Sequence, residues 1–365
     1  MKKARSENRA SIIVQARPLM LGFDKHAART TWTAALVLLL LYVVYLARKT
    51  LLVFTLALLF AYLLAPLVNL LDRVFRARGT RTAALAVTFA IVIAVAVVVG
   101  FQLGERVVEE ASALAHKFPA MVASWQQPQP NDHSLRAQVI EKVRSEVASR
   151  STSLIATLPQ YGLQILSVAS NVIYVVIIPI LAFFFLKDAP AMRGHALDLL
   201  DEGPRRLLLG DVISDVNVLL AQYMRALVLL SVAAFAAYAA FFSVMGMPYA
   251  LLLAAVAGLL EFIPMLGPLT AVALTLIVAG VAGVSVWPVI AFLAVFRMVQ
   301  DYLISPHLMA RGVELHPLLV LFGVFAGTEI AGIPGAFLSV PVLALVRILY
   351  LRIRKARLSA RQATA

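Results

Sequence analysis

The sequence predicts an all-α polytopic membrane protein with about eight transmembrane segments, two of them broken by proline and glycine. Hydrophobic residues make up 62% of the chain and charged residues 14%, whereas ordinary soluble domains carry roughly 25% charged residues. The apolar residues fall into runs that are long enough to cross a bilayer as helices. Basic residues gather beside these runs, at both ends of the chain.

The N-terminal part is expected to hold a basic cytoplasmic segment, residues 1–30, followed by three spans within residues 31–104. Residues 1–30 contain seven Lys or Arg and two acids, and basic flanks are typical of the cytoplasmic ends of spans. The spans are predicted near Thr31–Ala47, Leu51–Leu71 and Thr82–Leu103, with a net-basic connection between the second and the third.

The middle of the chain alternates between polar and apolar segments. Residues 105–160 are polar and balanced in charge, which favours an extracytoplasmic helical segment, with an amphipathic helix expected over Ser134–Leu158. A fourth span is predicted within residues 161–187. Residues 188–224 are polar again, and they are expected to form a cytoplasmic amphipathic segment before the next span.

Residues 225–350 are predicted to form a core with two broken apolar stretches, followed by a basic cytoplasmic tail, 351–365. Each broken stretch has an acid shortly before an Ile-Pro pair and a glycine after it, and each is either a kinked span or a re-entrant hairpin. Paired Gly/Pro-interrupted segments of this kind point to a transport site. The predicted helix-break and hinge residues are Pro264, Gly267 and Pro268 in the first stretch and Gly332, Pro334 and Gly335 in the second.

The candidate residues for substrate or ion coupling are acids and one arginine within these apolar stretches. Glu261 comes first, because an intramembrane carboxyl beside a helix break can take up and release a proton or contact a substrate. The alternative for Glu261 is a cap on the broken helix, and Glu329 follows the same logic in the second stretch. Arg297 and Asp301 lie four residues apart, so they can pair on one helix face or line a gate.

The C-terminal half resembles the AI-2E family of transporters, also called PerM-like permeases. The resemblance covers Asp211–Tyr350, and the N-terminal half fits in outline, with two close spans, a third span and an extended polar segment. One further site is looser, since Ala226 follows Tyr223-Met-Arg225 where the family commonly has glycine. The matching elements are Ile263-Pro264-x-x-Gly267-Pro268, Gln300-Asp301-Tyr302, Pro306, Leu315-His316-Pro317-Leu318, Gly332-x-x-Gly335 and Val340-Pro341.

The resemblance implies a multi-pass protein of the bacterial inner membrane that transports or exports a small molecule or ion and assembles as a homo-oligomer. No Walker loop or hydrolase motif occurs in the sequence, so we expect a gradient-coupled transporter and no enzyme, cofactor or metal site. The flanking basic residues are expected to meet anionic lipid headgroups and no nucleic acid. A membrane scaffold or regulatory protein, or a channel without active coupling, is the alternative.

The charge pattern predicts that both termini lie in the cytoplasm. Single cysteines can be placed freely, because the chain contains none. Cysteines at residues 5, 78, 200 and 355 should be protected from an impermeant maleimide in intact cells, whereas a cysteine at residue 130 should react. Labelling of residue 130 only after permeabilisation would contradict this topology.

Overall fold

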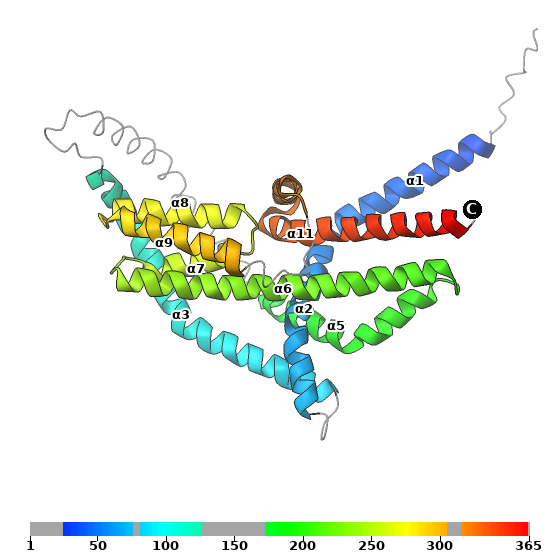
Figure 1. The fold of residues 1–365 in the computed structure, drawn as a ribbon, viewed down its shortest axis with the longest axis horizontal. Helices are drawn as coiled ribbons and strands as arrows, with labels where there is room; N and C mark the ends of the chain where they lie inside the picture. The colour runs from blue at the N-terminus through cyan, green and yellow to red at the C-terminus, as the bar shows by residue number, and fades with distance from the viewer. Residues whose placement is uncertain (1–24, 76–80, 126–171, 305–314, 364–365) are drawn as a thin grey trace, which may run out of the picture. The chain divides into compact units, whose positions relative to one another are not determined.

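The computed structural model describes residues 25–75, 81–125, 172–304 and 315–363, which are almost entirely helical (Figure 1). The fold class predicted from the sequence is therefore confirmed for these residues. The helices are α1 (Lys25–Leu46), α2 (Arg48–Phe75), α3 (Arg81–Trp125), α5 (Val172–Asp198), α6 (Pro204–Val244), α7 (Ala250–Leu260), α8 (Leu266–Val281), α9 (Val286–Val299), the π-helical turn η1 (Gln300–Ile304) and α11 (Pro317–Ala363).

Seven helices in the described part of the chain are long and apolar enough to cross a membrane, and α7 and α8 are shorter apolar helices. The protein is thus a multi-pass membrane protein. The chain divides into two compact units, of which the first ends at Leu52 and the second begins at Val53. The first unit contains α1, whose apolar side chains are largely exposed. Within it the guanidinium of Arg48 lies over the ring of Tyr45, 4.4 Å from its centroid. The amphipathic helix expected over Ser134–Leu158 lies outside the described residues.

Two helices run through boundaries that the sequence suggested. Helix α6 is continuous over Pro204–Val244, so it joins the predicted amphipathic segment to the predicted fifth span. Helix α3 likewise continues past residue 104 to Trp125. The predicted boundaries lie where the side chains change between polar and apolar. Such a change does not end a helix by itself, because the backbone hydrogen bonds of a helix are the same in its polar and its apolar part.

The first broken stretch forms a helical hairpin. Helices α7 and α8 pack against each other and lie beside α6 and α9 (Figure 1). With 11 residues, α7 is about 16 Å long, roughly half of the hydrocarbon thickness of a bilayer. This length favours a re-entrant hairpin over a kinked span.

Two glycines allow the hairpin to pack closely. A Cβ on Gly258 would lie 3.0 Å from the carbonyl oxygen of Ser231 on α6, whose hydroxyl donates a hydrogen bond to the Gly258 carbonyl at 2.7 Å. A Cβ on Gly267 would lie 1.7 Å from the carbonyl oxygen of Leu260. Gly267 is therefore required where α8 passes the end of α7.

The second broken stretch also folds back on itself. Helix α11 turns at Ala331 and Gly332, and Gly332 has a φ of 64°. A Cβ on Gly327 would lie 2.3 Å from the Gly335 carbonyl oxygen, so the segments before and after the turn are in backbone contact. Gly332 and Gly335 thus shape the turn, whereas Pro334 lies just inside the second arm and begins it.

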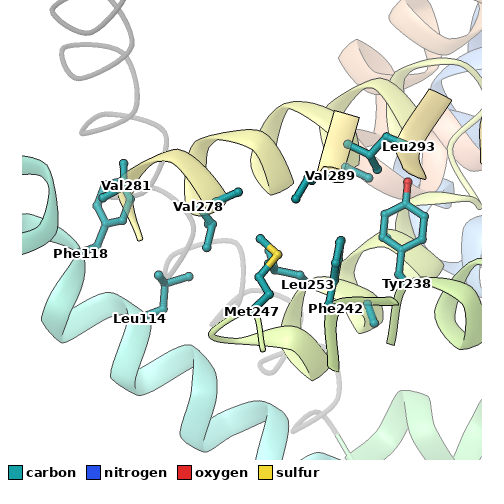
Figure 2. Packing of buried hydrophobic residues seen from close by; sticks show 14 residues of the cluster. Leu114, Phe118, Tyr238, Phe242, Met247, Leu253, Val278, Val281, Val289 and Leu293 are labelled. Atoms are coloured by element: carbon teal, nitrogen blue, oxygen red, sulfur yellow. The ribbon is translucent and has the colours of Figure 1, made fainter. Parts of the chain in front are cut away.

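The core of the C-terminal part lies among α3, α6, α7, α8 and α9. Figure 2 shows Tyr238 and Phe242 of α6 facing Val289 and Leu293 of α9, with Leu253 of α7 between the layers. The rings of Phe241 and Phe292 stack with their centroids 4.1 Å apart. This packing fixes the outer ends of the hairpin against the long helices.

Polar contacts fix the two ends of this assembly. The carboxylate of Glu110 on α3 accepts a hydrogen bond from the Leu252 N–H at 2.8 Å, which satisfies a free donor in the first turn of α7. At the other end of α6, Arg352 of α11 donates to Asp215 at 2.6 and 2.8 Å and to Asp211 at 2.7 Å. The second arm of α11 is thereby anchored to the N-terminal part of α6.

The hairpin geometry predicts that Gly267→Ala is strongly destabilising. The added methyl group would overlap the Leu260 carbonyl, and overpacking of this kind costs about 1–3 kcal/mol or more. The matched control is Gly100→Ala in α3, where no atom lies within 4 Å of the added carbon and alanine is favoured over glycine by ~1 kcal/mol. Unfolding in mixed micelles measures both. Equal stability of the two variants would contradict the hairpin.

Candidate functional site

A cavity of about 400 Å³ lies where the tip of the first hairpin meets α6, α9, η1 and α11. Most of its lining is apolar. The polar and charged residues in the lining are Gln222, Tyr223, Glu261, Arg297, Gln300 and Asp301.

Glu261 occupies the tip of the hairpin, at the C-terminal end of α7. Its side chain is buried, with 9% of the residue exposed, and its carboxylate accepts a hydrogen bond from the Gln300 side-chain amide at 2.7 Å. The end of a helix carries partial negative charge from its free carbonyl groups, which disfavours an acid. The amide of Gln300 supplies the donor that this buried carboxylate needs.

The π-helical turn η1 brings Gln300 and Asp301 to the cavity at the end of α9. Such single turns within α-helices are frequent at functional sites. Arg297 donates to Asp301 at 2.9 Å, the i,i+4 ion pair that the spacing predicted, and to the Gln300 side-chain oxygen at 3.5 Å. One polar chain therefore runs from Asp301 through Arg297 and Gln300 to Glu261.

Helix α6 contributes two polar atoms that do not belong to this series of hydrogen-bonded side chains. The side-chain oxygen of Gln222 and the hydroxyl of Tyr223 are buried, and neither has a hydrogen-bond partner among the described residues. Both residues line the cavity. Because buried polar groups in proteins are normally paired, these two atoms can take up a partner that the described residues do not supply.

The hairpin tip has a strained backbone. Met265 has φ 63° and ψ −54°, and the Leu266 N–H donates to the Pro264 carbonyl at 2.7 Å, which together define a γ-turn of the rare, strained kind. A methionine at positive φ is uncommon. Strain of this kind is typical of ligand-binding and switching segments, and Pro264, Met265 and Pro268 all line the cavity.

The structure brings together part of the set that the sequence singled out. Glu261, Arg297 and Asp301 share the cavity, and Gly267 lies at the neck of the hairpin beside it. Glu329 is exposed on the second hairpin and does not line the cavity. Gly332, Pro334 and Gly335 likewise lie at the second turn, outside the cavity lining.

Sequence reasoning did not assign a site role to Gln222, Tyr223 or Gln300. Two features of the sequence could have pointed to them. Each is a neutral polar residue within an apolar helix, and Tyr223 and Gln300 occur in the motifs Tyr223-Met-Arg225 and Gln300-Asp301-Tyr302. Among the residues that the structure describes, no group of three or more His, Asp or Glu is placed to hold a metal ion.

Comparisons with known proteins give a consistent result. The family described as AI-2E family transporter matches residues 34–355. The chain is similar to "Putative transport protein YrrI" of Bacillus subtilis (strain 168), with 28% identity over 182 residues, 49% of this chain and 51% of that protein. It is also similar to "Putative transport protein YueF" of the same organism, with 27% identity over 215 residues, 57% of this chain and 58% of that protein.

A third relative is "Putative permease PerM" of Escherichia coli (strain K12), with 26% identity over 243 residues, 65% of this chain and 64% of that protein. The matched part thus spans about half the length of YrrI and less than two thirds of YueF and PerM.

The hydrogen bond between Gln300 and Glu261 predicts that Gln300→Leu destabilises the protein. The substitution removes the donor to the buried Glu261 carboxylate, and an unsatisfied buried acceptor costs about 1–3 kcal/mol. Gln102→Leu is the matched control, because Gln102 is exposed on α3. The comparison is made by unfolding in mixed micelles. A loss of stability no greater than that of the control would show that Glu261 does not depend on Gln300.

Proposed function

Because the chain belongs to the AI-2E transporter family, we propose that it is a secondary transporter whose substrate site is the cavity at the tip of the α7–α8 hairpin. The substrate is a small organic molecule or an ion, and an ion gradient across the bacterial inner membrane drives its movement. The observation that carries this proposal is the buried carboxylate of Glu261, placed at a strained hairpin tip in a cavity that Gln222 and Tyr223 also line.

The arrangement of the two hairpins suits alternating access. The outer ends of α7 and α8 pack beside the C-terminal part of α6, whereas the second arm of α11 is tied to its N-terminal part by Arg352. The hairpins meet near the cavity, where the rings of Phe262 and Phe337 lie 5.9 Å apart. Broken helices that meet around a central site are the feature that allows a transporter to open one side at a time.

Glu261 is the residue that couples substrate movement to the gradient. An ionisable group in an apolar stretch is costly, so its presence favours a functional role. A carboxyl that alternately binds a proton and a substrate ties the two fluxes together. The sequence contains no Walker loop, which favours an ion gradient over ATP as the energy source.

The hairpins also affect the transmembrane topology, that is, the number of times the chain crosses the bilayer. If α7–α8 and α11 each enter and leave on one side, the crossing helices among the residues that the structure describes are α1, α2, α3, α5, α6 and α9 with η1. An even number of crossings among the described helices is consistent with termini on one side, and the basic residues at both ends favour the cytoplasm as that side.

Export of the substrate and assembly into a homo-oligomer are further parts of the proposal, and the family resemblance supports both. Right-side-out and inside-out vesicles distinguish the direction of net flux. Mass measurement of the purified protein in nanodiscs gives the number of copies.

The proposal predicts that Glu261→Gln abolishes gradient-driven accumulation. The substitution keeps the shape of the side chain but removes the charge, so exchange of bound substrate can survive while coupling is lost. The measurement is uptake and efflux in proteoliposomes under imposed pH and Na⁺ gradients, with equal protein per vesicle. Glu329→Gln is the matched control and should retain accumulation, because Glu329 does not line the cavity.

Two outcomes would contradict the proposal. Unchanged rate and pH dependence in Glu261→Gln would remove this residue from the coupling step. Flux that only dissipates gradients in the wild type, with no accumulation under any imposed gradient, would identify a channel instead.

A further inference from the structure

We propose that the cavity binds a small organic cation, in which an apolar body carries a primary ammonium group that Glu261 neutralises. The N–H groups of the ammonium also bond the Gln222 side-chain oxygen and the Tyr223 hydroxyl. This inference rests on the proposed transport function and narrows the substrate to one chemical class.

The size and lining of the cavity favour an organic body. Its volume of about 400 Å³ falls in the range of roughly 300–1,000 Å³ that is typical of sites for organic ligands, whereas one water needs only about 10–15 Å³. Leu, Val, Met, Pro and Ala supply ten of its sixteen lining residues. A bare inorganic ion would leave most of this apolar surface without a partner.

The charges around the cavity favour a single positive charge on the ligand. Arg297 and Asp301 form an ion pair with each other, so among the described lining residues Glu261 carries the remaining charge. Gln300 donates to one of its oxygens, and a carboxylate can accept further hydrogen bonds. A buried charge is costly unless an opposite charge compensates it, and an ammonium group supplies that charge.

The unpaired atoms on α6 favour a donor group with several N–H bonds. The Gln222 side-chain oxygen is an acceptor, and the Tyr223 hydroxyl can accept as well as donate. A primary ammonium has three N–H donors, enough for Glu261, Gln222 and Tyr223 together. The ligand would therefore satisfy the two buried polar atoms that the described residues leave without a partner.

Binding of such a cation exchanges it for a proton. When Glu261 is protonated, the arriving ammonium ion displaces that proton, so one positive charge enters the site and one leaves. Within the described part of the chain, the other titratable or charged groups around Glu261 are Tyr223 and Tyr238 from α6 and Arg297 and Asp301 from α9 and η1. The residues that α11 contributes to the lining are apolar. Affinity for the cation should fall as the pH is lowered.

The test is equilibrium binding to the full chain in nanodiscs, with no gradient present. The probes are 2-phenylethylammonium and 2-phenylethanol, which share the apolar body and differ in the charged group, and calorimetry measures both. The cation should bind at least about 10-fold more tightly than the alcohol, the ratio expected for a charge-assisted hydrogen bond. A large excess of NaCl, compared with the same excess of KCl, should not displace the bound 2-phenylethylammonium ion.

Variants assign the contacts. Glu261→Gln should lower affinity for 2-phenylethylammonium by about 10-fold or more, and Glu261→Asp should retain part of it. Tyr223→Phe should lower affinity by about 3- to 10-fold, the loss expected for one hydrogen bond. The matched controls are Glu329→Gln and Tyr350→Phe, whose side chains are exposed outside the cavity, and both should bind as the wild type does.

Equal affinity for the alcohol and the ammonium ion in the wild type, or no binding of either, would overturn the substrate class without touching the transport proposal, which stands or falls on flux. Binding of the cation with no flux under any gradient would overturn the transport function and leave the site assignment in place. An affinity that Glu261→Gln leaves unchanged while the variant remains folded would place the cation elsewhere.

Discussion

The turn between α7 and α8 places polar backbone among apolar helices, and the candidate site depends on how that backbone is satisfied. Within the turn, the N–H groups of Phe262 and Ile263 donate to Leu259 and Leu260, and that of Gly267 donates to Ile263. Pro264 and Pro268 carry no N–H, so they stand where a helix start would otherwise leave free donors. A membrane interior offers no water to such groups, which is why the turn must satisfy them internally.

The turn between α7 and α8 also brings the carboxylate of Glu261 to the cavity. Since the prolines and the γ-turn reverse the chain within a few residues, Glu261 is held at the hairpin tip and can reach a partner on another helix. That partner is Gln300, on the π-helical turn that follows α9. The hydrogen bond joins the tip to η1, whereas Ser231 joins the arm of α7 to α6. Movement of the tip relative to α9 would break the first contact and leave the second in place.

The two hairpins share one structural device and differ in their chemistry. In both, a glycine removes the side chain at the point where one arm passes the other, Gly267 beside Leu260 and Gly335 beside Gly327. The first hairpin presents a buried acid to the cavity. The second leaves Glu329 exposed and contributes apolar side chains such as Val340. The similar sequence patterns therefore accompany a close crossing of two arms in both hairpins, while the two acids lie in different surroundings.

The sequence by itself determined the class of fold, the two breaks and the leading acid. Runs of apolar residues, basic flanks and Gly/Pro pairs are local features, and each limits what the backbone can do in lipid. The pairing of Arg297 with Asp301 was predictable for the same reason, because helical periodicity places residues four apart on one face.

Only the tertiary structure decided that the broken stretches are hairpins, that Glu261 bonds Gln300, and that Glu329 lies outside the cavity. It also revealed that the Gln222 side-chain oxygen and the Tyr223 hydroxyl have no hydrogen-bond partner among the described residues. These facts depend on contacts between residues far apart in the chain, such as Glu261 with Gln300 and Gly258 with Ser231. Local periodicity carries no information about which helix faces meet, because many packings satisfy the same pattern of apolar residues.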